Sequence, residues 1–236
     1  MNMITSKQNP KIKALAALKA KPNDELVIEG QHLIEMALAS NLVMELLTVN
    51  PLPYAVPTTL ITPEIAKKLS DKVTTDGAFA LIKKPNLSLD KNKHLLYLDE
   101  VSDPGNMGTI LRTALAFNFG GVLLSPRCVN VYNEKVLSSA QGAHFLLPLK
   151  KATLTDLISL KKEGYKVVVT TLAKAVPIEA VPNDKLILVL GNEARGVSKP
   201  IFDVADYLVK INIRHIDSLN VAIAGAILMY EISKRS

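Results

Sequence analysis

The sequence predicts an α/β protein in two parts, a small domain over residues 1–90 and a larger domain over residues 95–236. Strand-length apolar runs alternate with helix-length amphipathic stretches along the chain, which is the pattern of α/β proteins. The runs of the second part are apolar at nearly every position, which is typical of a parallel sheet covered by helices on both faces. A polar, turn-rich stretch at 85–94 separates the two parts.

The first domain is predicted to be a small α/β unit. In chain order, its pattern predicts a helix at 11–20, a strand at 25–30, a helix at 31–40, a strand at 42–49, a helix at 63–70 and a strand at 78–85. Pro63 suits the first turn of its helix, because the N–H that proline lacks has no intrahelical partner there.

A basic segment opens this domain. Before Asn23 the chain has no acidic residue and five lysines, which are Lys7, Lys11, Lys13, Lys19 and Lys21. Such a segment can neutralise nucleic-acid phosphates in contacts that do not depend on base sequence. A solvated helix face is an equally good interpretation of the same lysines.

The second domain is predicted to be doubly wound. Its apolar runs lie at 95–101, 120–126, 165–172, 185–192 and 206–213, with helical stretches near 106–118, 133–140, 153–164 and 218–234. Ligands of such sheets bind beyond the carboxyl ends of the strands, so the loops that follow the strands are the candidate site.

Composition excludes several classes of protein. The longest apolar run, 221–230, is about half a membrane span, so no transmembrane helix is predicted. The first residues lack the apolar core of a secretory signal, and we expect a cytoplasmic protein. Cys128 is the single cysteine and the four histidines are scattered, so neither a disulfide nor a metal site is predicted. The sequence contains no phosphate-binding loop of the G-x-G-x-x-G or G-x-x-x-x-G-K-[ST] type.

The first candidate loop follows the run at 95–101. Asn106 stands where a helix begins, either as a plain N-cap or as a site residue. Gly108 permits close approach of another backbone, and Arg112 lies one turn further on the same face. A lone arginine in the apolar stretch ILRTALAF must be either paired in the core or functional.

Two further loops are rich in glycine, asparagine and charge. The loop GNEARGVS contains Gly191 and Glu193, and an internal pair of Glu193 with Arg195 is its simplest interpretation. The last loop contains Ser218 and Asn220 at the start of an apolar helix, where we expect Ser218 to be the N-cap.

Taken together, the three loops resemble the three motifs of the SpoU (TrmH-type) family of the SPOUT RNA methyltransferase superfamily. They read Asn106-x-Gly108-x-x-x-Arg112, Gly191-Asn192-Glu193-x-x-Gly196-x-Ser198 and Ser218-Leu219-Asn220-Val221, in the order and at the spacing of that family. The resemblance covers residues 95–234. The segment ELVIEGQHLIEMALAS resembles the substrate-binding domain often fused to these enzymes, which is similar to small ribosomal proteins that bind RNA.

The resemblance implies a parallel-sheet SPOUT domain with a trefoil knot, preceded by a small α/β RNA-binding domain. It implies an S-adenosylmethionine-dependent ribose 2′-O-methyltransferase that acts on RNA as a homodimer, with rRNA favoured over tRNA. By position, it implies catalytic roles for Asn106, Arg112, Glu193, Ser218 and Asn220, and cofactor contacts for Thr170, Thr171, Gly191, Ile211 and Leu219.

One loop departs from the family pattern. Where the family has Ile-Pro and then a glycine-containing loop, residues 211–217 contain neither proline nor glycine and are one residue shorter. This departure leaves open an RNA-binding or ribosome-assembly protein with an impaired cofactor pocket. A tRNA 2′-O-methyltransferase is a second alternative.

Overall fold

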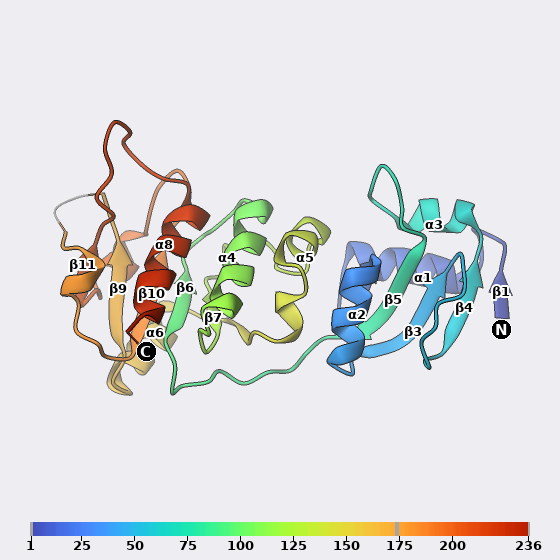
Figure 1. The fold of residues 1–236 in the computed structure, drawn as a ribbon, viewed down its shortest axis with the longest axis horizontal. Coiled ribbons are helices and arrows are strands. Elements are labelled where there is room, and N and C mark those ends of the chain that lie inside the picture. The colour runs from blue at the N-terminus through green and yellow to red at the C-terminus, as the bar shows by residue number, and fades with distance from the viewer. Residues whose placement is uncertain (1, 173–174, 236) are drawn as a thin grey trace. The chain divides into compact units, whose positions relative to one another are not determined.

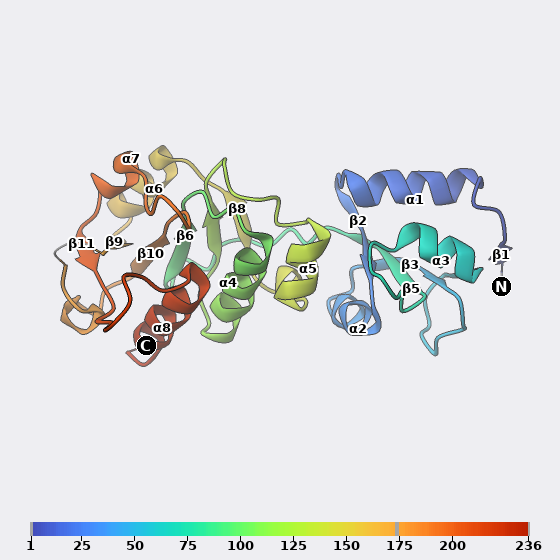
Figure 2. The ribbon, with the colours of Figure 1, turned by 90° about the horizontal axis from the view of Figure 1, so that it is seen from above.

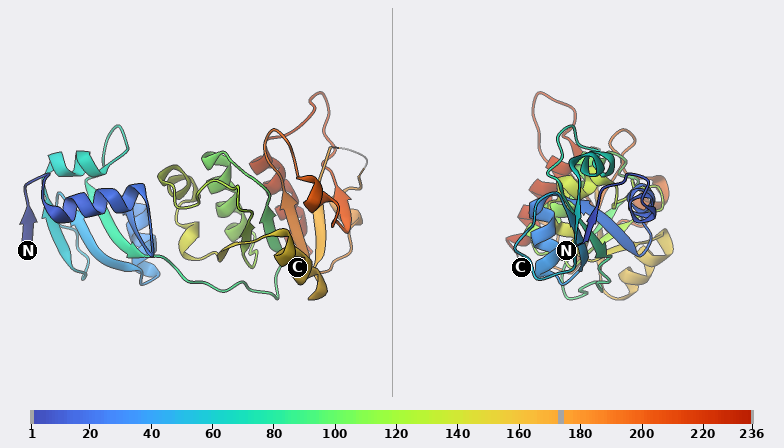
Figure 3. Two further views of the ribbon diagram at one scale, coloured as in Figure 1. Left: turned by 180° about the vertical axis from the view of Figure 1, so that it is seen from behind. Right: turned by 90° about the vertical axis from the view of Figure 1, so that its right-hand side faces the viewer.

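The computed structural model describes residues 2–172 and 175–235. Two compact units divide the chain, Met1–Pro85 and Asn86–Ser236. A single segment without helix or strand leads from the first unit to the second (Figure 3).

The first unit contains a mixed five-stranded sheet in the order β1-β4-β3-β5-β2 (Figure 1). Its strands are β1 (Asn2–Ile4), β2 (Glu25–Glu29), β3 (Val43–Thr48), β4 (Thr58–Ile61) and β5 (Ala78–Lys83). Strand β5 runs antiparallel to β2 and β3, whereas β1, β4 and β3 are parallel. The sequence pattern missed β1 and β4, because three or four residues are too few to show a period of two.

Helices cover both faces of this sheet (Figure 2). Helices α1 (Pro10–Ala20) and α3 (Pro63–Leu69) lie on one face and α2 (Gln31–Ala39) on the other. The basic segment folds mainly as α1, where Lys11 pairs with Glu45 at 2.5 Å and Lys19 lies 3.4 Å from Asp71. Its other lysines, Lys7, Lys13 and Lys21, are exposed and available to a polyanion.

The second unit contains a six-stranded sheet in the order β11-β9-β10-β6-β7-β8, and every neighbouring pair is parallel. The strands are β6 (Leu95–Leu98), β7 (Val122–Leu124), β8 (Leu149–Lys151), β9 (Lys166–Thr170), β10 (Leu186–Leu190) and β11 (Tyr207–Val209). The predicted parallel α/β sheet is confirmed. Strand β8 was not predicted, because it is a short, largely exposed edge strand.

Two layers of helices sandwich this sheet (Figure 2). Helices α4 (Pro104–Ala116), α5 (Glu134–Ala140) and α8 (Val221–Ser233) cover one face, and α6 (Leu154–Lys162) and α7 (Lys199–Phe202) cover the other. Two single turns of 3₁₀ helix complete the unit, η1 (Ala143–Phe145) and η2 (Ile178–Ala180). The trefoil knot stays a prediction.

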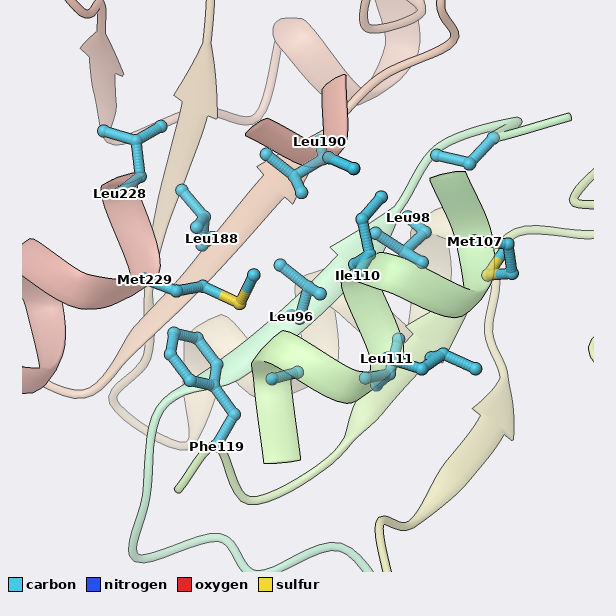
Figure 4. Close-up of a cluster of buried hydrophobic side chains, with 14 of the residues drawn as sticks. Leu96, Leu98, Met107, Ile110, Leu111, Phe119, Leu188, Leu190, Leu228 and Met229 are labelled. Carbon is cyan, nitrogen blue, oxygen red and sulfur yellow. The ribbon is translucent and has the colours of Figure 1, made fainter. Parts of the chain in front are cut away.

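The larger core lies between α4, α8 and the central strands. Ile110 and Met229 meet the strand residues Leu96, Leu188 and Leu190 there (Figure 4). Strands β10 and β6 are neighbours although about 90 residues separate them in sequence. Because both run in the same direction, the loops that follow them emerge at the same edge of the sheet.

Candidate active site

A cavity of about 690 Å³ opens beyond the carboxyl ends of β9, β10 and β11. Its volume lies in the range of roughly 300–1,000 Å³ that is usual for small-molecule sites. Nine of the ten predicted site residues line it: Asn106, Thr170, Thr171, Gly191, Glu193, Ile211, Ser218, Leu219 and Asn220. Arg112 is not among its lining residues.

The start of α4 places Asn106 at this cavity. Asp103 is the N-cap, and its carboxylate accepts a hydrogen bond from the backbone N–H of Asn106 at 2.7 Å. Asn106 therefore lies within the first turn, and the interpretation of Asn106 as a plain N-cap is wrong. Its side chain is free of the capping role and is available for contacts with other loops.

Glu193 ties the loop after β10 to the start of α4. Its Oε1 accepts from the Asp103 N–H at 3.0 Å and from Asn106 Nδ2 at 3.1 Å. Its Oε2 accepts from the N–H of Ser102 at 3.2 Å and from the hydroxyl of Ser102 at 3.0 Å. Partial burial alone would raise the pKa of Glu193, but the hydrogen bonds outweigh it and lower that pKa below its ordinary value. The carboxylate is thus held ionised at neutral pH.

Asn220 joins the third loop to the same network. Its Nδ2 donates to Oδ1 of Asn106 at 2.9 Å, and its Oδ1 accepts from the N–H of Ala222 at 2.9 Å. Asn220 is therefore the N-cap of α8, and the expected capping role of Ser218 is wrong. Ser218 precedes the helix by three residues and faces the cavity with an exposed side chain.

The loop after β10 is a closed turn. Asn192 and Gly196 exchange two backbone hydrogen bonds of 3.0 and 2.9 Å, and Gly196 has the positive φ of +70° that favours glycine. A Cβ on Gly191 would lie 2.3 Å from backbone atoms of Gly196 and Val197. The loop can close only because residue 191 has no side chain. The expected pair of Glu193 with Arg195 is wrong, because Arg195 pairs with Glu100 at 2.7 Å.

The wall opposite is formed by strand ends and by the loop that follows β11. The Thr170 hydroxyl donates to the carbonyl of Val189 at 3.0 Å, which fixes the end of β9 against β10. Ile211 and Leu219 are half-buried and supply apolar surface. A cavity that combines apolar walls with several polar side chains and backbone groups suits an amphipathic small molecule such as a nucleoside derivative.

Comparison with known proteins decides the family. The sequence model of the "SpoU rRNA Methylase family" matches residues 93–230. The 23S rRNA (guanosine(2553)-2′-O)-methyltransferase RlmP of Bacillus subtilis (strain 168) is 32% identical, over 98% of this chain and 99% of its own. The chain belongs to the SpoU rRNA methylase family.

Solved structures have the same fold. A crystal structure of an RNA 2′-O ribose methyltransferase superposes with a TM-score of 0.83 and 26% identity, over 99% of this chain and 98% of that one. An AdoMet-bound rRNA methyltransferase from Sinorhizobium meliloti superposes with a TM-score of 0.86 and 24% identity, over 99% and 97%. The predictions of the fold of this family and of an RNA methyltransferase are confirmed. S-Adenosylmethionine as methyl donor stays a prediction.

The loop that departs from the SpoU family pattern contains an unusual backbone. His215 has a φ of +67°, a left-handed conformation that glycine adopts more readily than histidine. The turn therefore forms without the glycine that the family pattern has there. Ile211 and Ile213 still line the cavity, so the altered loop keeps its apolar contribution to the wall.

Arg112 stands apart from the other SpoU motif residues. It lies six residues beyond Asn106, about 9 Å further along α4, and its side chain is exposed. The interpretation of Arg112 as a paired core residue is wrong. Within the described parts of the chain its guanidinium has neither an ion pair nor a hydrogen bond. Its catalytic role stays a prediction, as do the roles of the nine cavity residues.

Ser102 and Asp103 contact Glu193 but were not predicted as site residues. Ser-Asp-Pro is a recognisable helix start, since Asp103 is a favoured N-cap type and Pro104 is a favoured first residue. That signal could have placed the helix start correctly.

None of the helices in the described residues is long and apolar enough to cross a membrane.

Proposed function

We propose that this protein transfers a methyl group from S-adenosylmethionine to the 2′-hydroxyl of a ribose in ribosomal RNA, with 23S rRNA as the first substrate to test. The observation that supports this most directly is the hydrogen-bonded series Asn220–Asn106–Glu193 on the rim of the cavity. It joins one side chain from each of the three motif loops beside the space for the donor.

The residues suit the chemistry of an alcohol nucleophile. S-Adenosylmethionine would supply an electrophilic methyl group and would leave as S-adenosylhomocysteine. The ribose hydroxyl must be aligned with that methyl group, and its proton passes to solvent water. Glu193 orients the amide of Asn106, and Asn106 and Asn220 offer amide groups to the ribose. A guanidinium stabilises the negative charge that develops on the 2′-oxygen, and Arg112 is the motif residue with this chemistry.

We also propose a homodimer formed through α8. Ile223, Ile227 and Tyr230 are 54%, 38% and 50% exposed and follow the i, i+4, i+7 spacing of one helix face. A second copy of the same face would cover them. An Ile227→Lys variant is expected to sediment as a monomer in analytical ultracentrifugation, whereas the wild type sediments as a dimer.

The dimer also gives Arg112 a place in the mechanism. Arg112 is exposed on α4, which packs against α8, and it does not line the cavity of its own chain. We propose that it serves the cavity of the partner subunit. Mixing an inactive Arg112→Ala variant with an inactive Gly191→Leu variant should restore about a quarter to a half of the activity, because mixed dimers contain one complete site. No restoration would contradict this arrangement.

Methyl transfer itself is tested with labelled S-adenosylmethionine and rRNA from cells that lack the protein. The label should appear at alkali-resistant dinucleotides, which mark a 2′-O-methyl ribose. Label on a base, or label only when tRNA is offered, would contradict the proposal. Because the substrate is ribosomal RNA, we place the protein in the cytoplasm.

A further inference from the structure

A buried carboxylate beside the cavity holds two arginines from different loops. Glu100 follows β6, and its side chain is only 9% exposed. Its Oε2 accepts from Nη2 of Arg195 at 2.7 Å, and its Oε1 pairs with Nη2 of Arg127, in the loop after β7. The side chains of Arg195 and Arg127 are 69% and 74% exposed. Neither arginine belongs to the residues predicted from the motifs.

The backbone of Glu100 is held by hydrogen bonds in the conformation that places its carboxylate between the two arginines. Its φ is +60°, in the left-handed region that glycine adopts more readily. Two hydrogen bonds hold it there: its N–H donates to Oγ of Ser125 at 2.9 Å, and its carbonyl accepts from Nδ2 of Asn192 at 2.9 Å. A glutamate occupies a strained position, and its carboxylate fixes both arginines.

The cluster of Glu100, Arg127 and Arg195 has positive charge and N–H donors with which it could bind an anion. Two guanidiniums and one carboxylate leave a net charge of +1, and each guanidinium has five N–H donors. In residues 2–172 and 175–235, neither guanidinium has a hydrogen-bond partner other than Glu100. The exposed donors form a fork that matches two oxygens of a phosphate.

The position of the cluster indicates which anion it binds. Arg195 lines the same cavity as Asn106 and Asn220, so the cluster lies at the rim where a ribose must enter. An RNA ribose arrives with a phosphodiester on each side. We propose that Arg127 and Arg195, positioned by Glu100, bind a backbone phosphate next to the methylated ribose, an inference that rests on the proposed function.

The test compares Arg127→Gln, Arg195→Gln and Glu100→Gln with a matched control, Lys91→Gln. Lys91 is also exposed and also ion-paired, with Glu163 at 2.7 Å, but it lies in the segment before β6, away from the cavity. The probes are rRNA from cells that lack this protein and S-adenosylmethionine, each bound separately to the full chain. The KM for RNA and kcat are measured in parallel.

Each arginine variant should weaken RNA binding about tenfold relative to Lys91→Gln, as expected for one charge-assisted phosphate contact. The slope of log affinity against log salt should fall by about one. Affinity for S-adenosylmethionine should stay unchanged. Arginine variants that bind RNA as the Lys91→Gln control does would overturn the site. If the arginine variants lost binding of S-adenosylmethionine instead, the arginines would be assigned to the carboxylate of the methyl donor. That result would also overturn the proposed phosphate site.

The Glu100→Gln variant distinguishes a role of Glu100 in positioning the two arginines from a purely electrostatic effect of its charge on RNA binding. The variant makes the rim more positive, so unspecific attraction alone would tighten RNA binding. Positioning predicts the opposite, a KM for RNA that rises about tenfold with a smaller change in kcat. Tighter binding with an unchanged KM would overturn the role of Glu100. The binding measurements need no turnover, so they decide the phosphate site even if the wild type transfers no methyl group to this RNA.

Discussion

Replacing Glu193 by glutamine perturbs the centre of the network and leaves its shape nearly unchanged. The carboxylate accepts five hydrogen bonds, two on Oε1 from Asp103 and Asn106 and three on Oε2 from Ser102 and Asn192. In Glu193→Gln one oxygen becomes an NH₂ group that cannot accept. The two or three donors that face this group lose their acceptor, and the hydrogen bonds to the remaining oxygen are no longer strengthened by a negative charge.

The magnitude follows from these bonds. Two or three lost hydrogen bonds of about 0.5–1.5 kcal/mol each, taken at the low end because the site is exposed to water, give a loss of about 1–2 kcal/mol. This corresponds to a melting temperature about 2–8 °C lower for a chain of this size. Because the amide of Asn106 is no longer held, kcat should fall about 100-fold, the effect of a small misplacement at a reacting centre.

Two assays test this: thermal unfolding at several pH values, and the rate of methyl transfer. The control is Glu163→Gln, because Glu163 is also an exposed carboxylate in an ion pair. The pKa of Glu193 is lower in the folded chain than in the unfolded chain. The ionised carboxylate therefore stabilises the fold fully at a pH above its unfolded pKa, and this stabilisation is lost as the pH falls through its folded pKa. The stability gap between wild type and Glu193→Gln should therefore close in acid. A gap that is independent of pH, or a kcat like that of Glu163→Gln, would refute this reasoning.

Three further predictions concern single sites. Burial lowers the pKa of His144 from 6.5 to about 4, so the chain should lose up to about 3 kcal/mol of stability as the pH falls from 6.5 to 4, measured by urea unfolding. Gly108→Ala should cost about 1–3 kcal/mol in urea unfolding, because a Cβ there would lie 2.4 Å from Cβ of Ser139 on α5. Gly191→Ala should weaken S-adenosylmethionine binding at least tenfold by calorimetry, because its Cβ would displace the backbone of Gly196.

Each of these predictions has a contrary result. A His144→Gln variant with the same acid sensitivity as the wild type would show that another group is responsible. Wild-type stability of Gly108→Ala would mean that α4 and α5 can separate without cost. Unchanged affinity of Gly191→Ala would mean that the loop after β10 does not shape the donor site.

The loops at the cavity could be predicted because each follows an apolar, strand-length run, whereas the individual cavity residues were predicted from the resemblance to the family motifs. The carboxyl ends of parallel strands meet at one edge, so the polar loops after β6, β10 and β11 had to converge. Single-residue roles were harder to predict. Ser218 and Asn220 are equally good N-cap types, and the choice of Asn220 depends on its hydrogen bond to Asn106, 114 residues away.

The partner of Arg195 was also difficult to predict from the sequence. Glu193, two residues away, is its obvious partner in the sequence, but the closed turn between Asn192 and Gly196 directs the two side chains to different partners. The true partner, Glu100, is 95 residues away and stands in a left-handed conformation that no local pattern predicts for glutamate. Long-range pairs of this kind are determined by the packed sheet rather than by neighbouring residues.

The central claim is that three loops of this chain place a methyl donor beside an RNA ribose. Its most direct test is a map of 2′-O-methyl groups in the rRNA of cells with the protein, without it, and with Glu193→Gln in its place. We expect one ribose methyl group to disappear on deletion, to return with the wild-type chain and to remain largely absent with Glu193→Gln. An identical map in all three strains would contradict the account.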